Sequence, residues 1–287
     1  MGPATAILRP LALALPVLFL AGCSNLFFVP MKELRLSPDD LGLDFENVFI
    51  DSSDGVRLYA WLLPAEGEAR GTLLFLHGNA ENISTHIGSV YWLPARGYNV
   101  LLLDYRGYGL STGEPTLEGA TADVQAGLRW LLDNPRLTPR RIVVLGQSLG
   151  GSLAVEAVAR GGLAGDIRGL ILDSAFADYR LIAREKLAGF WLTWPLQYPL
   201  SWTIRDDYRP LEAVARIGPT PLLIIHGDAD RIIPEHHARL LFEAAGEPKA
   251  IWHVPGARHI GALHQPEIRD RLDAWLRAVL TDGGTPP

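Results

Sequence analysis

The sequence predicts an α/β fold: a doubly wound, mostly parallel sheet that carries a small helical cap. Short apolar runs recur along the chain with little polar alternation, as in strands that are covered on both faces. Helical spacing of apolar residues falls between most of these runs. One long interval, 173–221, breaks the alternation and is rich in tryptophan, which indicates the cap.

Composition limits the classes of protein to consider. The chain has 287 residues, 48% hydrophobic and 20% charged, which is typical of a globular protein. Single α/β domains of ~250 residues are common, so this length does not require two domains. The net charge is −6 without a cationic stripe, so we expect no nucleic-acid partner. Cys23 is the only cysteine, which excludes an intrachain disulfide and cysteine-based zinc sites.

Residues 1–22 are predicted to be a signal peptide. Leu11–Leu20 is uncharged and has the length of a signal-peptide apolar region, about half of what spans a bilayer. The sequence Leu-Ala-Gly-Cys that ends at Cys23 resembles the bacterial lipobox. This resemblance implies that Cys23 is lipidated and anchors the protein in the bacterial cell envelope, facing the periplasm, with the outer membrane favoured. The alternative is an uncleaved N-terminal membrane anchor over residues 11–30.

The remaining chain divides into three parts. Residues 23–45 are expected to be a lipid-anchored tether, because they become polar from Met31 and contain Pro38. Residues 46–281 are expected to form the α/β domain. The Gly- and Pro-rich tail, 282–287, is expected to be disordered.

Individual elements follow from the apolar patterns. Val56–Leu63 alternates in part and lies between Asp54-Gly55 and Pro64, which indicates an exposed or edge strand of a hairpin. Buried strands are expected at 72–76, 100–103, 142–145, 170–172, 222–225 and 250–254. Helices are expected at 116–132, at 152–160 and around 272–279.

The cap is expected over about 175–215. Trp191, Trp194 and Trp202 lie there among aliphatic residues, outside the alternation of strands and helices. A cap above the sheet would supply the apolar wall of a substrate pocket. The alternative is an ordinary crossover helix whose tryptophans belong to the core.

A candidate nucleophile follows the strand at 142–145. Gly146-Gln147-Ser148-Leu149-Gly150 joins this strand to a helix, and a turn that sharp needs neighbours without side chains. Such a turn exposes the serine hydroxyl at the carboxyl edge of the sheet, where active sites of open α/β sheets lie. Serine needs a base to become nucleophilic.

Candidate partners for Ser148 follow later strands. Asp228 and Asp230 come directly after 222–225, and His259 follows a Gly-Ala turn after 250–254. Rival residues are Asp173 for the acid and His226, His253 and His264 for the base. The chain order serine, aspartate, histidine is that of α/β-hydrolases.

Two further motifs begin where strands stop: His77-Gly78-Asn79-Ala80 and the segment Asp104–Gly109. Together these signatures resemble the α/β-hydrolase superfamily over 46–281, in a branch described as esterases, lysophospholipases, acyl-protein thioesterases or serine aminopeptidase-like proteins. The resemblance implies an α/β-hydrolase fold. It also implies a triad of Ser148, Asp230 and His259, with Asp230 placed by the pattern His-Gly-x-x-Asp-x-x-hydrophobic-Pro, and an oxyanion hole formed by the backbone N–H groups of Asn79 and Leu149.

The implied function is a serine hydrolase that cleaves carboxylic esters or thioesters of apolar acyl groups through an acyl-enzyme. Its substrate would be a small acyl ester or a lipid. The alternatives are a serine aminopeptidase-like peptidase and a non-catalytic envelope lipoprotein. We expect no cofactor and no metal ion, because the sequence has no phosphate-binding loop, dinucleotide fingerprint or metal-ligand cluster. The oligomeric state is not predicted.

Overall fold

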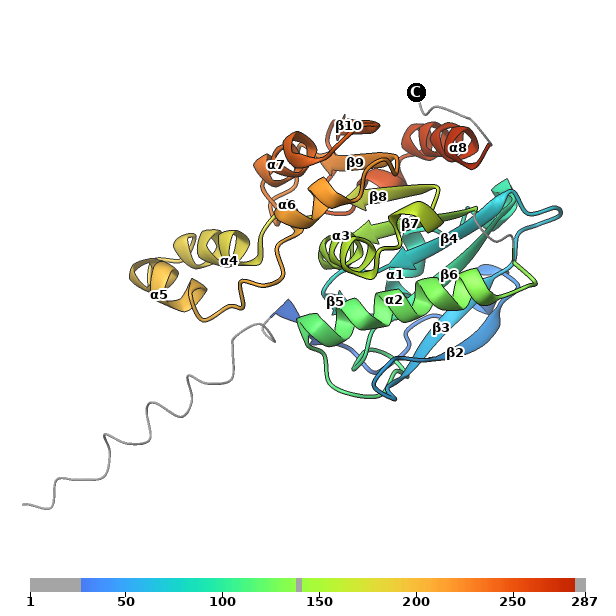
Figure 1. Cartoon of the computed structure of the whole chain (residues 1–287), viewed down its shortest axis with the longest axis horizontal. Coiled ribbons are helices and arrows are strands. Elements are labelled where there is room, and N and C mark those ends of the chain that lie inside the picture. Colours follow the sequence, from blue (N-terminus) through green and yellow to red (C-terminus); the bar gives the residue numbers. More distant parts are fainter. Residues whose placement is uncertain (1–26, 138–140, 282–287) are drawn as a thin grey trace, which may run out of the picture.

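The computed structural model describes residues 27–137 and 141–281 (Figure 1). The predicted signal peptide, Cys23 and the predicted tail at 282–287 lie outside these residues. In the part of the chain described, no helix has both the length and the apolar character needed to cross a bilayer.

An eight-stranded sheet in the order β10-β9-β8-β7-β4-β6-β3-β2 forms the centre of the domain. The strands are β2 (Glu46–Asp51), β3 (Arg57–Leu63), β4 (Gly71–Leu76), β6 (Tyr98–Asp104), β7 (Ile142–Gln147), β8 (Gly169–Asp173), β9 (Leu222–Gly227) and β10 (Lys249–Val254). β3 pairs antiparallel with β2 and β6, and every other pair is parallel. The predicted doubly wound, mostly parallel sheet is therefore confirmed, and each of the six predicted buried strands lies inside an observed one.

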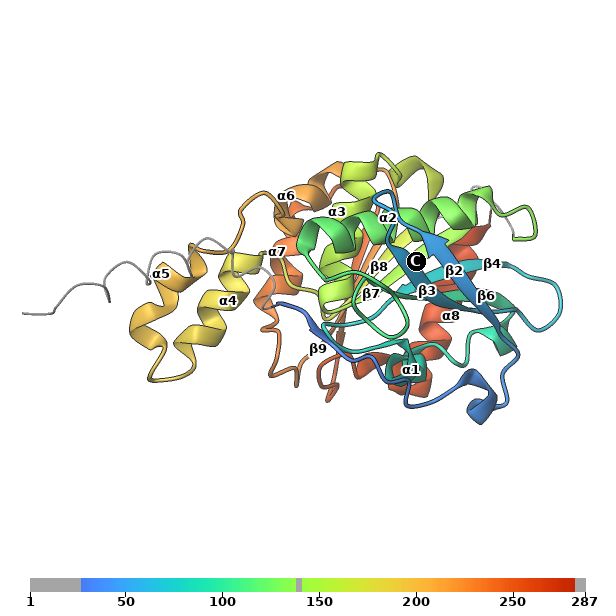
Figure 2. The same cartoon turned by 90° about the horizontal axis from the view of Figure 1, so that it is seen from below.

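Helices cover both faces of this sheet. They are α1 (Ile83–His86), α2 (Leu117–Asp133), α3 (Leu149–Gly161), α4 (Tyr179–Ala188), α5 (Gln197–Ser201), α6 (Pro210–Ala213), α7 (His236–Ala244) and α8 (Pro266–Leu280). Figures 1 and 2 show α2, α3, α6 and α7 over one face and α8 with α1 over the other, while α4 and α5 project beyond the sheet. All three predicted helices are observed.

Alternating side chains bind the two helical layers to the sheet. In β4, Leu74 and Leu76 pack into the core beneath α2 and α3, whereas Leu73 and Phe75 pack into the core beneath α8. Successive side chains of a strand point to opposite faces, so a strand that is covered twice must be apolar at every position. This explains the continuous apolar runs in the sequence.

The strand predicted from Val56–Leu63 does form a hairpin, with β2, but its predicted edge position is wrong. β3 lies between β2 and β6 and is buried at every residue except Arg57. The edge is β2, where Phe49 is exposed beside the buried Val48 and Ile50. The edge strand of the hairpin is therefore β2 and not the predicted β3, because only β2 has one face open to solvent.

Residues 27–45, which we expected to belong to a tether, pack along the domain. β1 (Val29–Pro30) pairs in parallel with β5 (Ala80–Glu81). The Asn82 side-chain amide donates to the carbonyls of Met31 and Glu33 at 3.0 and 2.8 Å. These contacts use backbone atoms of the N-terminal segment, so composition gives no signal of them.

Candidate active site

Two loops meet at the carboxyl edge of the sheet where the strand order reverses. β6 follows β4 on one side, and β7 to β10 extend on the other. Ligands of open α/β sheets bind outside the strands at such a switch point. The loop that contains Asn79 follows β4, and the turn that contains Ser148 follows β7, so both are at this position.

Ser148 lies in a strained turn between β7 and α3. Its backbone has φ 52° and ψ −117°, a conformation that residues with a Cβ rarely adopt. A Cβ at Gly150 would lie 2.3 Å from the carbonyl oxygen of Leu76, and one at Gly146 would lie 2.5 Å from that of Gly150. Only glycine fits at these two positions, because β4 comes close to Gly150 and the start of α3 comes close to Gly146.

Asp230 and His259 form the hydrogen-bonded pair expected from the sequence. His259 Nδ1 lies 2.8 Å from Asp230 Oδ2, while Oδ1 accepts the backbone N–H groups of Ile232 and Ile233 at 2.8 and 3.0 Å. Burial alone would raise the pKa of Asp230, but the bond and charge of His259 and these N–H groups outweigh it, leaving the pKa below the ordinary aspartate value. Asp230 therefore stays ionised and holds the imidazole in one orientation.

The rival acids have other partners. Asp228 Oδ1 accepts the N–H of Gly256 at 2.7 Å and so braces the loop after β10. Asp173 is fully buried and accepts a hydrogen bond from Gln147 Nε2 at 2.8 Å. Burial raises the pKa of Asp173 to about 6, although the Gln147 bond and the nearby His259 oppose the shift.

None of the rival histidines is paired with Asp230 as His259 is. His226 is buried, its Nε2 lies 3.0 Å from the carbonyl oxygen of Ile233, and burial lowers its pKa. His253 is exposed on β10, 3.1 Å from Glu235. His264 ends a short 3-10 helix after the loop and is exposed.

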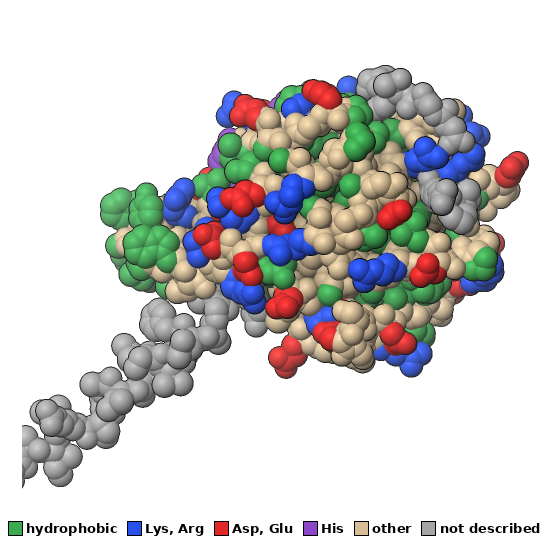
Figure 3. All heavy atoms as spheres, in the orientation of Figure 1, with side chains coloured by type: hydrophobic (Ala, Val, Ile, Leu, Met, Phe, Trp, Pro, Cys, Tyr) green, Lys and Arg blue, Asp and Glu red, His purple; other side chains and the backbone are tan. Residues whose placement is uncertain are grey.

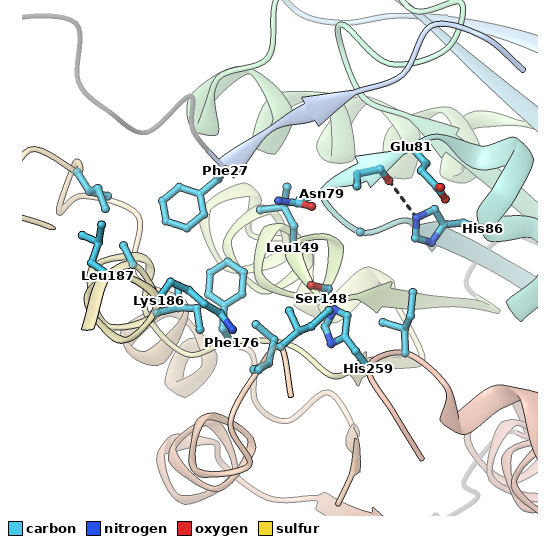
Figure 4. Close-up of a pocket in the computed structure, with 18 of the residues that line it drawn as sticks. Phe27, Asn79, Glu81, His86, Ser148, Leu149, Phe176, Lys186, Leu187 and His259 are labelled. Carbon is cyan, nitrogen blue, oxygen red and sulfur yellow. Dashed lines mark hydrogen bonds between the residues drawn. The ribbon is translucent and has the colours of Figure 1, made fainter. Parts of the chain in front are cut away.

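The structure brings Ser148 and His259 to the wall of one cavity, where Figure 4 shows the two side chains next to each other. Within the described residues, no hydrogen bond joins Ser148 Oγ to the imidazole. Such bonds are often long before substrate binds. The predicted trio is thus gathered at one place, with the aspartate–histidine bond already formed.

Asn79 and Leu149, the predicted oxyanion-hole residues, line the same cavity. Within the described residues, neither backbone N–H donates to a protein acceptor. Leu149 is the first residue of α3, where backbone N–H groups have no partner inside the helix. Both donors are therefore free to bind an oxygen of a ligand next to Ser148.

Residues of the Asp104–Gly109 segment hold the loop after β4 in place. Tyr108 Oη donates to the Asn79 carbonyl at 2.6 Å, and Val29 N–H donates to the same oxygen at 3.0 Å. Tyr105 Oη donates to the carbonyl of His77 at 2.9 Å. The segment thus acts through the position of Asn79 and not by contact with the cavity.

Arg106, in the same segment, braces the neighbouring loops. Its buried guanidinium pairs with Asp123 of α2 at 2.7 Å and with Asp54 of the β2–β3 turn at 2.6 Å. A Cβ at Gly119 would lie 2.5 Å from this guanidinium. The arginine therefore ties α2 and the hairpin to the loop after β6.

The cavity has a volume of about 550 Å³ and is mostly apolar. Besides the loops that contain Asn79, Ser148 and His259, it is lined by the cation Lys186 and by the apolar residues Phe27, Phe176, Ile182, Ala183, Leu187, Leu200, Ile204 and Ile232. Most of these side chains come from α4, α5 and the segments beside them, so the cap does form an apolar wall. Its tryptophans contribute nothing to that wall, nor are they core residues: Trp191, Trp194 and Trp202 are 79%, 60% and 68% exposed.

Among the cavity residues that sequence reasoning did not single out are Phe27, Glu81 and His86. Phe27 lay in the expected tether. Burial, and then the neighbouring His77, lower the pKa of His86 to about 4, so its ring is neutral at pH 7. His86 Nε2 lies 3.1 Å from the carbonyl oxygen of Ala80, a contact that fixes the loop (Figure 4). No motif in the sequence marked these positions.

A second hollow, of about 570 Å³, shares the lining residues His259 and Ile232 with the first cavity. Arg231 and Arg258 line it together with Ala229, Ile232 and Gly256. Both arginines are exposed, and within the described residues neither forms an ion pair. His259 therefore borders both the mostly apolar cavity and a hollow that carries two exposed arginines.

A cluster at the base of the cap joins α4 to α7. Glu185 lies 2.8 Å from His236 Nε2 and 3.0 Å from His237 Nε2, and the three could in principle surround a metal ion. However, His237 Nδ1 accepts the N–H of Ala177 at 3.2 Å, so the proton of the neutral ring is on Nε2. That nitrogen has no lone pair for a metal, and the cluster is explained as a hydrogen-bonded clasp.

Comparison with known proteins shows the family to which the chain belongs. The family model described as serine aminopeptidase, S33, matches residues 67–209. The chain is 36% identical to YfhR of Escherichia coli (strain K12), over 89% of this chain and 88% of that protein. It is 33% identical to the alpha/beta hydrolase domain-containing protein WAV2 of Arabidopsis thaliana, over 90% of this chain and 84% of that protein.

Among solved structures, the Pyrococcus furiosus esterase Pf2001 superimposes with a TM-score of 0.69 at 23% identity, covering 88% of this chain and 96% of that one. This likeness shows the fold. The sequence similarity to WAV2 and to the family model shows the family. The chain belongs to the α/β-hydrolase superfamily.

Proposed function

We propose that this protein is a serine hydrolase that cleaves carboxylic esters or thioesters of apolar acyl groups. The observation that carries the proposal is the Asp230–His259 pair beside Ser148, at the wall of a mostly apolar cavity. A nucleophile, a base and a group that orients the base are the parts that acyl transfer requires.

The mechanism follows from these positions. His259 accepts the proton of Ser148 Oγ as this oxygen attacks the acyl carbonyl, and Asp230 stabilises the resulting imidazolium. The N–H groups of Asn79 and Leu149 bind the oxyanion, and His259 then gives its proton to the leaving group. Water, deprotonated by His259, attacks the acyl-enzyme and releases the acid and the free serine.

The two hollows indicate how a substrate would lie. The acyl chain would bind in the apolar cavity, because burial of each methylene favours binding by ~0.8 kcal/mol. The leaving group must lie on the side of His259, because that residue protonates it. Arg231 and Arg258 line the second hollow together with His259, so we propose that leaving groups with a phosphate or carboxylate are favoured, as in a lysophospholipid.

Labelling with a fluorophosphonate probe tests the proposal. We expect the wild-type protein to be labelled and Ser148→Ala not to be, because only an activated serine reacts. Hydrolysis of nitrophenyl esters of increasing chain length should then favour long acyl groups. Absence of labelling in a folded wild-type protein would instead support a non-catalytic envelope lipoprotein.

An aminopeptidase is the second candidate, supported by the description of the matching family model. Glu81 lines the cavity and is the carboxylate there that could bind a substrate ammonium group. Assays with aminoacyl amides next to esters decide between the two. Amide hydrolysis that falls in Glu81→Gln, while ester hydrolysis is unchanged, would favour the aminopeptidase.

We also propose that lipidated Cys23 anchors the enzyme to the bacterial envelope, on the outer membrane, facing the periplasm. The support is the lipobox-like sequence that ends at this residue. Metabolic labelling with a palmitate analogue should modify the wild-type protein and not Cys23→Ser. The mass of the purified chain separates this from the alternative, since an uncleaved membrane anchor keeps residues 1–22.

A further inference from the structure

We propose that the tip of the cap docks on the surface of a lipid bilayer. We define the cap tip as residues 187–204, the end of α4, the following turn and α5. This run of 18 residues has no aspartate, glutamate, lysine, arginine or histidine, in a chain that is 20% charged. Docking there does not depend on which bond the enzyme cleaves, so the inference goes beyond the proposed function.

The side chains of the cap tip are more exposed than the fold requires. Seven large apolar side chains are 48% to 79% exposed: Phe190, Trp191, Leu192, Trp194, Leu196, Tyr198 and Trp202. Figure 3 shows them gathered at the end of the molecule formed by α4 and α5. An apolar surface of this kind on a protein marks an interaction site or a liability for aggregation.

The chemistry of the cap tip fits a bilayer surface. Tryptophan and tyrosine, four of the seven exposed residues, prefer the boundary between headgroups and acyl chains, where one end of the ring is apolar and the other is wet. Arg184 and Lys186 precede the tip on α4, where Arg184 lies over the ring of Tyr198 and the exposed Lys186 also lines the cavity; within the described residues neither forms an ion pair. Lipid phosphates would supply their counter-ions.

The N-terminal segment brings the same end of the molecule to a membrane. Phe27 packs against Phe176 and against Tyr179, the first residue of α4, with ring centroids 6.1 and 5.0 Å apart. Cys23 precedes Phe27 by four residues, a reach of at most ~14 Å in extended chain. An acyl anchor on Cys23 would therefore hold the base of the cap next to the bilayer.

The cavity gives the docking a consequence. Phe27 and the cap residues Leu187, Leu200 and Ile204 line it, so its apolar wall continues into the surface that would face the lipid. An acyl chain could pass from the bilayer to Ser148 along this wall without crossing water. A second copy of the chain is the competing occupant, and we favour the bilayer because the flanking cations and the anchor segment lie at the same end.

The test uses the full chain in vesicles of phosphatidylethanolamine and phosphatidylglycerol whose acyl chains are brominated near the headgroup. Bromine quenches tryptophan on contact, so the exposed Trp191, Trp194 and Trp202 report docking while the buried tryptophans do not. The variant Leu192→Asp/Leu196→Asp keeps all reporters and places two charges on the cap tip. Leu36→Asp/Leu110→Asp, two exposed leucines elsewhere, is the matched control.

We expect wild-type and control proteins to be quenched alike, and quenching of the cap variant to fall at least ~10-fold, since charge opposes insertion at the interface. Ser148→Ala should be quenched like the wild type, so the result is independent of catalysis. Circular dichroism confirms that each variant is folded. Equal quenching of cap variant and wild type overturns the proposal. So does an unquenched wild-type dimer that the cap variant converts to a monomer.

Discussion

The loops around Ser148 and the cap tip lie at the same end of the sheet but differ in what fixes their residues. In the loops, hydrogen bonds within the protein hold the Asn79 carbonyl and the Asp230 carboxylate in place, and glycine occurs where neighbouring backbone would come within 2.5 Å of an added Cβ. In the cap tip, large apolar side chains face solvent. The loops have residues that their own geometry demands, whereas the cap tip has residues that only another surface could explain. Substitutions in the two regions should therefore fail in different assays.

The largest expected effect is on catalysis. Asp230→Asn should lower kcat on a nitrophenyl ester ~10⁴-fold, because the amide no longer holds the imidazole in the right tautomer. Asp228→Asn is the matched control: its side chain can still accept the Gly256 N–H, so activity should stay within about threefold. Steady-state kinetics measure both. Similar losses in the two variants would mean that the loop, and not the Asp230–His259 bond, carries the effect.

The next effect is on the turn that holds Ser148. Gly150→Ala places a Cβ 2.3 Å from the Leu76 carbonyl oxygen, and we expect a loss of ~3 kcal/mol or more in the free energy of unfolding. Gly165→Ala is the control, since nothing lies within 4 Å of its added Cβ. Chemical denaturation gives both values. A stable Gly150→Ala protein would show that the turn can shift away from β4.

Asp173 gives a pH-dependent effect of intermediate size. Its pKa is raised to about 6 by burial, so the folded protein binds this proton more tightly than the unfolded chain, and stability falls as pH rises from ~4 to ~6. Asp173→Asn has no such proton to lose. The free energy of unfolding of the variant, relative to that of the wild type, should therefore rise by ~2–3 kcal/mol between pH 4 and pH 7. Denaturation curves at several pH values test this, and parallel curves would contradict it.

The smallest effect is expected at the cap tip. Trp202→Ser should change the free energy of unfolding by no more than ~0.5 kcal/mol, because its side chain is 68% exposed. Trp275→Ser, a wholly buried tryptophan of α8, should cost several times as much, ~3 kcal/mol. Thermal unfolding compares them. A large loss at Trp202 would indicate that the tip packs on the molecule in solution.

The sequence predicted some parts of the structure better than others. The strands and the turn at Ser148 could be predicted because their constraints are local: burial on two faces demands continuous apolar residues, and a tight turn demands glycine. Asp230 and His259 were placed by motif and chain order. The structure then joined them by a hydrogen bond.

What the sequence did not predict depends on contacts between distant segments. Pairing of β1 with β5 uses backbone atoms alone, so nothing in the residues announces that Val29 belongs to the domain. Phe27 and His86 reach the cavity only through the tertiary arrangement. The density of tryptophan did locate the cap, but the residues alone could not show that these rings face outward, because apolar side chains fit a core and an interface equally well.

The pairing of β1 with β5 has a practical consequence for anyone who produces this enzyme in soluble form. Composition places the start of the domain near residue 46, and a fragment cut there would keep the entire eight-stranded sheet. It would also lose the N–H of Val29 that donates to the Asn79 carbonyl, and the phenyl ring of Phe27 that lines the cavity next to Ser148. Such a fragment should fold yet hydrolyse poorly, so recombinant versions should begin before Phe27.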